Sequence, residues 1–131
     1  MKKITLLIAV LSVLVITALC LVGCTNLPKE PKDAVKKLED GGCKVSLQTG
    51  TDELTTLKNE IEDHGYILFF DLTAYIDIKL GDDAGIMIYC EDIDDAQKVY
   101  EYLGLYGSYK THYQDNKIVF AGTDAIFELL K

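Results

Sequence analysis

The order of helix and strand patterns along the chain predicts an α+β fold, a ferredoxin-like split βαβ arrangement with helices on one face of an antiparallel sheet. Three observations lead to this prediction. Apolar residues switch between helical and strand spacing, two neighbouring strands are separated by a short turn, and glycines or turn residues mark most boundaries. The elements follow the order helix, strand, helix, β-hairpin, helix, strand, helix, so extra N- and C-terminal helices flank the central βαββαβ portion.

The first half of the predicted fold contains two helices with a strand between them. Pro31 is suited to the first turn of a helix, and the pair Gly41-Gly42 is suited to its end. Residues 43–48 alternate between apolar and polar side chains, which predicts a half-buried strand. A second helix is capped at residue 51 or 52 and ends at Gly65.

The second half begins with a predicted hairpin. Residues 66–80 are rich in aromatic and β-branched side chains, and a turn of glycine and aspartate joins them to a strand at 86–90. Asp92 is suited to cap the helix that follows. Two late strands, at 108–113 and 117–121, precede a final helix.

The charge of the chain argues against nucleic-acid binding. Its 131 residues carry 13 lysines, no arginine and 21 acidic residues, for a net charge of −8. The first 23 residues hold two of these lysines and no acid, so the remaining 108 residues carry 11 lysines and a net charge of −10. Such a domain repels a phosphate backbone, and it lacks arginine and a basic stripe.

Residues 1–23 have the pattern of an export signal. Lysines at positions 2 and 3 precede an apolar run that ends in Leu21-Val22-Gly23-Cys24. This motif resembles the lipobox of type II signal peptides in bacterial lipoproteins. The resemblance implies that Cys24 is lipidated and becomes the new N-terminus, on the extracytoplasmic face of the cell membrane. The alternative is an uncleaved anchor, because residues 4–23 are long enough to span about 30 Å as a helix.

The sequence divides into three parts. Residues 1–23 form the lipoprotein signal peptide, residues 24–31 form a short lipid-anchored tether, and residues 32–131 form a single α+β domain. Because eight extended residues reach at most about 28 Å, we expect the domain to lie close to the bilayer.

The expected fold predicts a disulfide between Cys43 and Cys90. The first and third strands of a split βαβ sheet are antiparallel neighbours, and these cysteines begin the first strand and end the third. The register that gathers apolar side chains on one face pairs Cys43 with Cys90, Val45 with Ile88 and Leu47 with Ile86. Export also permits oxidation. The alternative is two buried free thiols.

The sequence contains no recognisable catalytic or metal-binding constellation, and we assign no cofactor. His64 and His112 lack the ligand spacing of a zinc site, and the acids at 91–95 lack the loop of a calcium site. We expect these acids to favour a helix N-terminus instead. One alternative is an envelope enzyme or metal-binding accessory that uses His112 and nearby acids. It requires His112, His64 and carboxylates to share one pocket.

Tyrosine and methionine side chains form a predicted interface. In the expected register Tyr75, Met87 and Tyr89 lie on the sheet face away from the core, and Tyr102 lies outside the apolar face of its helix. Such side chains are enriched at protein interfaces, so this patch on an acidic surface is typical of an interaction site. The alternative is that the first helix or the late strands cover it.

Three segments carry a further resemblance: KDAVKKLEDGG at 32–42, IYCED at 88–92, and VFAGTDAI at 119–126. They resemble small lipoproteins of low-GC Gram-positive bacteria that have no assigned activity, a resemblance that spans residues 32–131 and implies no catalytic residue. We therefore expect a non-enzymatic, membrane-anchored binding module whose partner is another envelope protein or a small ligand. Surface display without a dedicated ligand is a further alternative.

Overall fold

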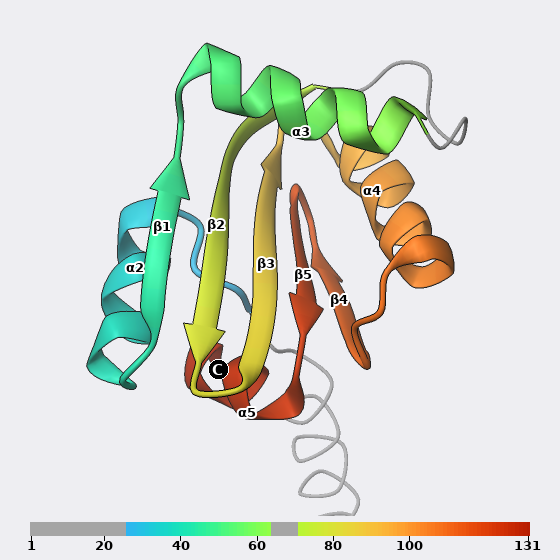
Figure 1. Cartoon of the computed structure of the whole chain (residues 1–131). Helices are drawn as coiled ribbons and strands as arrows, with labels where there is room; N and C mark the ends of the chain where they lie inside the picture. The colour runs from blue at the N-terminus through green and yellow to red at the C-terminus, as the bar shows by residue number, and fades with distance from the viewer. Residues whose placement is uncertain (1–25, 64–70) are drawn as a thin grey trace, which may run out of the picture.

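The computed structural model describes residues 26–63 and 71–131, which form a five-stranded sheet with four helices (Figure 1). The elements are α2 (Pro31–Asp40), β1 (Lys44–Gln48), α3 (Thr51–Asp63), β2 (Leu72–Leu80), β3 (Asp83–Cys90), α4 (Ile93–Tyr106), β4 (Thr111–Asp115), β5 (Ile118–Gly122) and α5 (Asp124–Leu130). The predicted α+β class is confirmed, and the antiparallel sheet is consistent with a split βαβ arrangement plus helices. The predicted signal peptide, Cys24 and His64 lie outside the described residues.

The strand order differs from the expected one. The sheet has the order β1-β2-β3-β5-β4, so β1 pairs with β2, and the predicted pairing of the first and third strands is wrong. The place beside β3 belongs to β5. All five residues of β5 are buried, whereas the residues of β1 are half-buried or exposed. A strand that is apolar on both faces is stable only inside the sheet, which leaves the edge to β1.

Helices cover both faces of the sheet, rather than one face as predicted. Figure 1 shows α2 and α5 behind the sheet, α3 across its upper end, and α4 at its right. One core cluster joins α2 and α5 to side chains such as Ile76 and Met87. A second cluster joins α3 and α4 to Ile88 and Val119. The reason is that successive residues of β3 point alternately into the two clusters, so its continuous apolar sequence needs cover on both sides.

Local signals place two helix boundaries. At the end of α2, Gly42 adopts a φ of 92°, and the N–H groups of Gly42 and Cys43 donate to the carbonyls of Glu39 and Leu38 at 3.0 and 2.9 Å. This hydrogen-bond pair is the Schellman motif, which turns the chain directly into β1. At the start of α4, the Asp92 carboxylate accepts a hydrogen bond from the Asp95 N–H at 2.8 Å, as its predicted capping role requires.

The segment 26–30, which we call the N-terminal strap, is packed against the sheet. Leu27 is only 2% exposed and belongs to the α2/α5 core cluster. Its N–H donates to Asp115 Oδ2 at 2.8 Å, and the Tyr89 hydroxyl donates to the Pro28 carbonyl at 2.7 Å. Residues that the sequence assigned to a tether are therefore part of the folded domain from Leu27 onward.

Candidate functional site

One cleft combines acidic, aromatic and apolar side chains, and we call it the α3/α4 cleft. Its volume is about 470 Å³, and it lies on the sheet face that α3 and α4 partly cover. Apolar side chains line its inner part, namely Leu57, Ile61, Ile86, Ile88 and Leu103. Polar and aromatic residues surround them, with glycine at one turn: Thr56, Glu60, Tyr75, Asp77, Tyr102, Gly107, Ser108 and Tyr109.

The alternation of β2 places two polar side chains in this cleft. Ile76 and Ile78 point into the α2/α5 cluster, so Tyr75 and Asp77 point to the opposite face. On that face α3 crosses only the upper end of the sheet, while α4 lies beside β4 and β5 (Figure 1). The outer face of β2 is therefore left partly uncovered between the two helices.

Two carboxylates give the cleft a negative charge. Burial, and then the charge of Glu60, raise the pKa of Asp77, while Lys79 lowers it in part. No lysine or histidine is among the residues that line the cleft. Within residues 26–63 and 71–131, the Asp77 carboxylate has no hydrogen bond and no ion pair. The negative charge of Asp77 is thus not neutralised by an ion pair among the described residues.

Three tyrosines border these carboxylates. Burial and then the nearby acids, Asp77 foremost among them, raise the pKa of Tyr75, and burial followed by Asp77 raises the pKa of Tyr109. Both phenols therefore stay neutral at ordinary pH. Tyr102 is half-buried at the same site. The tyrosines offer ring faces and hydroxyl groups next to the negative charge.

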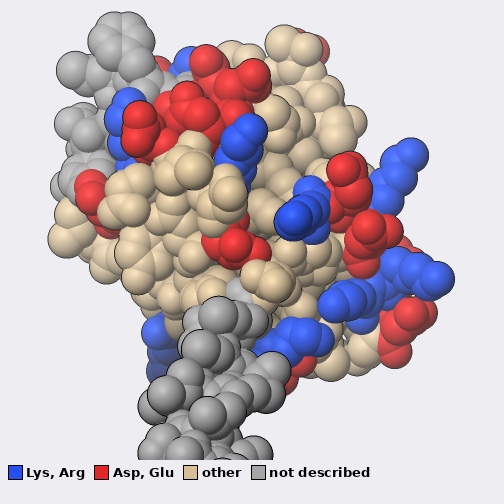
Figure 2. Space-filling view, turned by 180° about the vertical axis from the view of Figure 1, so that it is seen from behind, with Lys and Arg blue, Asp and Glu red and all other residues tan. Residues whose placement is uncertain are grey.

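A larger hollow, of about 580 Å³, lies beside the N-terminal strap. Its lining includes Lys29 and Lys117 together with Glu30 and Asp115, so both signs of charge are present. Figure 2 shows the α2/α5 side of the molecule, where lysines and acids are likewise interspersed. Because mixed charges select no one class of ligand and Asp115 already holds the strap, the smaller cleft is the better candidate site.

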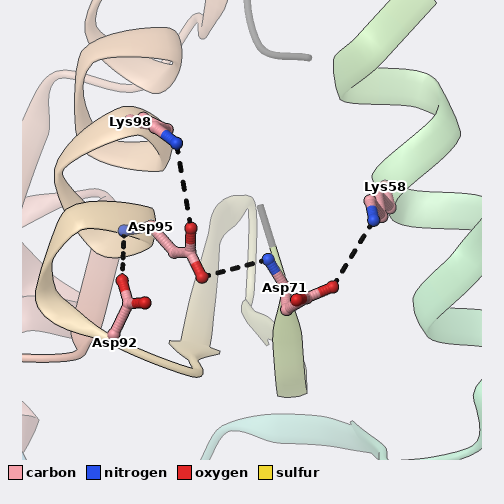
Figure 3. A network of polar contacts seen from close by, with 5 residues as sticks. All are labelled: Lys58, Asp71, Asp92, Asp95 and Lys98. Carbon is pink, nitrogen blue, oxygen red and sulfur yellow. Dashed lines mark hydrogen bonds and ion pairs between the residues drawn. The ribbon is translucent and has the colours of Figure 1, made fainter. Parts of the chain in front are cut away.

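A polar network fixes the two helices that bound the cleft (Figure 3). Lys58 on α3 lies 3.5 Å from Asp71, whose N–H donates to the buried carboxylate of Asp95 at 3.2 Å. Asp95 in turn lies 4.0 Å from Lys98, and its N–H is capped by Asp92. The acids at the start of α4 thus bind the residue that precedes β2, and an ion pair at the surface links that residue to α3.

The predicted tyrosine and methionine patch is divided between the two faces of the sheet. Tyr75 and Tyr102 line the α3/α4 cleft. Met87 and Tyr89 are 0% and 5% exposed in the opposite cluster, so their assignment to a surface interface is wrong. The N-terminal strap, α2 and α5 cover them. Of these, the sequence analysis had named only the first helix as an alternative cover.

The predicted disulfide is not present. Cys43 and Cys90 are both free and buried, and they belong to different core clusters on opposite faces of the sheet. The prediction failed because β1 pairs with β2, so the register that faced the two thiols does not form. Burial first, then the charges of Asp95 and Asp92, raise the pKa of Cys90 to about 12. Such a thiol is a poor nucleophile.

His112 has a structural contact rather than a place in the cleft. Its Nε2 lies 3.0 Å from the Leu103 carbonyl at the end of α4, and a carbonyl can only accept, so Nε2 carries the proton. Among residues 26–63 and 71–131, no three His, Cys, Asp or Glu side chains could together hold a metal ion. His64 falls outside those ranges.

Sequence reasoning missed four residues that the structure makes important. Glu60, Asp77 and Tyr109 line the cleft, and Leu27 fixes the strap. The alternation of β2 did contain a signal for Asp77, but the polar half of a strand is ordinarily read as solvent-facing. Leu27 is a single apolar residue between polar ones and a proline, so no periodic pattern marks it.

Comparisons with known proteins identified no matching family model, curated protein or solved structure. None of the helices within the described ranges has the length and apolar character needed to cross a membrane.

Proposed function

We propose that this protein is a lipid-anchored, non-enzymatic binding module at the extracytoplasmic membrane face, and that its binding surface is the α3/α4 cleft. The observation that supports the proposal is the placement of the cleft relative to the N-terminal strap. Leu27 belongs to the α2/α5 cluster, whereas Tyr75 and Asp77 point to the other side of the sheet. The cleft can therefore stay open to another envelope protein or a small ligand while the domain is held at the bilayer.

The strap supports a close attachment to the membrane. Only Thr25 and Asn26 separate the proposed lipid site, Cys24, from the buried Leu27. Three residue steps span at most about 11 Å, so the domain has little freedom to move away from the headgroups. A module of this kind meets partners that are themselves at the membrane surface.

The cleft has the composition of a binding site more than that of a catalytic centre. Apolar side chains form its inner part and a few polar groups converge at its edge, as in typical ligand sites. An envelope enzyme or metal-binding accessory based on His112 would need that side chain beside a carboxylate cluster. His112 instead contacts the Leu103 carbonyl, which leaves this alternative without a supporting contact.

Metabolic labelling with an alkyne-bearing fatty acid tests the anchor. The native chain should take up the label and begin at Cys24 by mass spectrometry, and Cys24→Ala should take up none. An unlabelled chain that still begins at Met1 would instead identify an uncleaved anchor.

Site-specific photo-crosslinking in intact cells tests the cleft. A photoreactive residue at Thr56 lies in the cleft, and one at the exposed Lys36 on α2 serves as the control on the opposite face. We expect a discrete adduct, seen by intact mass, from position 56 and not from position 36. Adducts from position 36 alone would contradict the assignment of the cleft as the binding surface.

A further inference from the structure

We propose that the domain turns one surface toward the bilayer and that this surface contacts anionic lipid headgroups. The surface, which we call the strap surface, consists of the N-terminal strap, the first turn of α2 and the β4–β5 turn, and its exposed lysines are Lys29, Lys32 and Lys117. This inference rests on the membrane attachment proposed above, and it adds the surface that meets the membrane and the class of lipid there. It is the same for a lipid on Cys24 and for an uncleaved anchor.

The described part of the chain begins at the strap surface. Leu27 is 2% exposed, and its N–H donates to Asp115 Oδ2 at 2.8 Å, at the end of β4. The Tyr89 hydroxyl donates to the Pro28 carbonyl at 2.7 Å and fixes the next residue of the strap. Three residue steps separate Leu27 from Cys24 and reach at most about 11 Å. An attachment at Cys24 or before it therefore holds the domain close to the bilayer beside the β4–β5 turn.

Three lysines lie around this point. Lys29 and Lys117 line the same hollow as Asn26, and Lys32 follows in the first turn of α2. All three are exposed, and within residues 26–63 and 71–131 they form no ion pair. A lysine is attracted to an anionic membrane when it lies within about a Debye length of it, about 10 Å at 0.1 M salt. The short link to Cys24 brings the strap within that range.

The distribution of charge over the domain favours the same orientation. The two segments 51–63 and 91–106, which contain α3 and α4, together carry two lysines and ten acids. The strap, α2, the β4–β5 turn and α5, at 26–40, 115–117 and 124–131, together carry six lysines and seven acids. Figure 2 shows lysines spread among the acids on this side of the molecule. An anionic surface repels the α3/α4 side much more strongly, so the domain turns that side and its cleft away from the bilayer.

The rate of lysine acetylation in nanodiscs tests this orientation. The full chain is reconstituted in nanodiscs of phosphatidylcholine alone and in nanodiscs that also contain phosphatidylglycerol, and peptide mass spectrometry measures how fast a water-soluble reagent acetylates each lysine. Two exposed lysines are internal controls. Lys79 follows Ile78, which points into the α2/α5 cluster, so Lys79 points to the opposite face. Lys110 precedes β4 and is about 20 Å from the β4–β5 turn, the length of that strand.

We expect anionic lipid to slow the acetylation of Lys29, Lys32 and Lys117 about fivefold, because each lysine at such a surface gains a modest attraction. The rates at Lys79 and Lys110 should stay unchanged. Salt at 1 M should remove the difference between the two nanodiscs, because the Debye length then falls to about 3 Å. Shielding by the short link alone would instead be the same with and without phosphatidylglycerol.

Paired charge reversals give a matched control. Lys29→Glu with Lys117→Glu should remove the slowing at Lys32, because the strap surface then repels the anionic lipid. Lys79→Glu with Lys110→Glu changes the net charge by the same amount and should leave the slowing at Lys32 in place. Circular dichroism checks that both double variants fold.

Equal acetylation rates at the strap lysines in the two nanodiscs would overturn the proposal, as would an equal loss of slowing in the two double variants. If the chain stays in the nanodiscs but its strap lysines react as fast as Lys79, the orientation is wrong and the membrane attachment stands. A chain that does not stay in the nanodiscs would refute the attachment, and the orientation with it. The crosslink at position 56 tests the cleft separately from all of these results.

Discussion

Replacing Leu27 tests whether the N-terminal strap is part of the core. Its side chain is 2% exposed and packs in the α2/α5 cluster, so Leu27→Ala removes nearly all of a buried leucine contact. Buried leucine-to-alanine changes cost about 2–5 kcal/mol. The strap is the end of the packed chain and can shift to close part of the cavity, so we expect a cost near the lower limit, about 2–3 kcal/mol. This is a large share of the roughly 5–15 kcal/mol that stabilises a typical domain.

Urea unfolding followed by circular dichroism measures this cost on residues 24–131, with Cys24→Ser to remove the proposed lipid site. The matched control is Leu105→Ala, because Leu105 is 66% exposed near the end of α4. We expect the control to change the free energy of unfolding by no more than about 0.5 kcal/mol.

A double-mutant cycle with Asp115→Ala examines the same contact from the other side. Asp115 accepts the hydrogen bond from the Leu27 N–H, so both substitutions act by releasing the strap. The free energy of unfolding lost in Leu27→Ala and that lost in Asp115→Ala should therefore add up to more than the loss in the double variant. A Leu27→Ala cost below about 0.5 kcal/mol, or strict additivity with Asp115→Ala, would refute the docked strap.

Three further predictions concern other parts of the structure. Gly42→Ala should destabilise the domain by about 1–2 kcal/mol in urea unfolding, because Gly42 has a φ of 92°. In contrast, Gly104→Ala should stabilise it by about 0.5–1 kcal/mol, because Gly104 lies in α4 with open space around its Cα and alanine favours a helix. Cys43 and Cys90 should react with iodoacetamide only after denaturation, because burial raises the pKa of both thiols, and mass spectrometry should then count two added groups. Burial and the neighbouring Glu60 raise the pKa of Asp77. Ionised Asp77 therefore lowers the stability of the fold at a pH above this pKa, and the loss disappears as the pH falls and Asp77 takes up a proton. Asp77→Asn should therefore raise the melting temperature at pH 7, by a margin that shrinks toward pH 4, and a constant margin would contradict this cause.

Local patterns in the sequence determined the elements of this fold. The glycine pair after α2 predicted its end, because only glycine easily adopts the positive φ found at Gly42. Asp92 predicted the start of α4 for an equally local reason, since its carboxylate caps an N–H three residues away. The alternation in β2 separated Ile76 from Asp77 correctly, because the period of a strand depends on the backbone alone.

The choice of partners for those elements was decided by the tertiary structure. Val45 and Leu47 match the apolar residues of β2 as well as those of β3, so alternation alone could not select between the two neighbours. That choice followed from β5, which is buried on both faces and occupies the place beside β3. The disulfide prediction failed with this choice, because it required β1 and β3 to be neighbours.

The candidate site likewise combined a local property with a distant one. The sequence by itself determined that Tyr75 and Asp77 share the polar side of a strand. Only the tertiary structure brought Glu60 and Tyr109 to the same cleft, and only the burial of Leu27 on the opposite face separated the N-terminal strap from the cleft. The physical reason is that side-chain direction repeats over two residues, whereas charge coupling, burial and the position of a chain end depend on elements that are remote in sequence and adjacent in space.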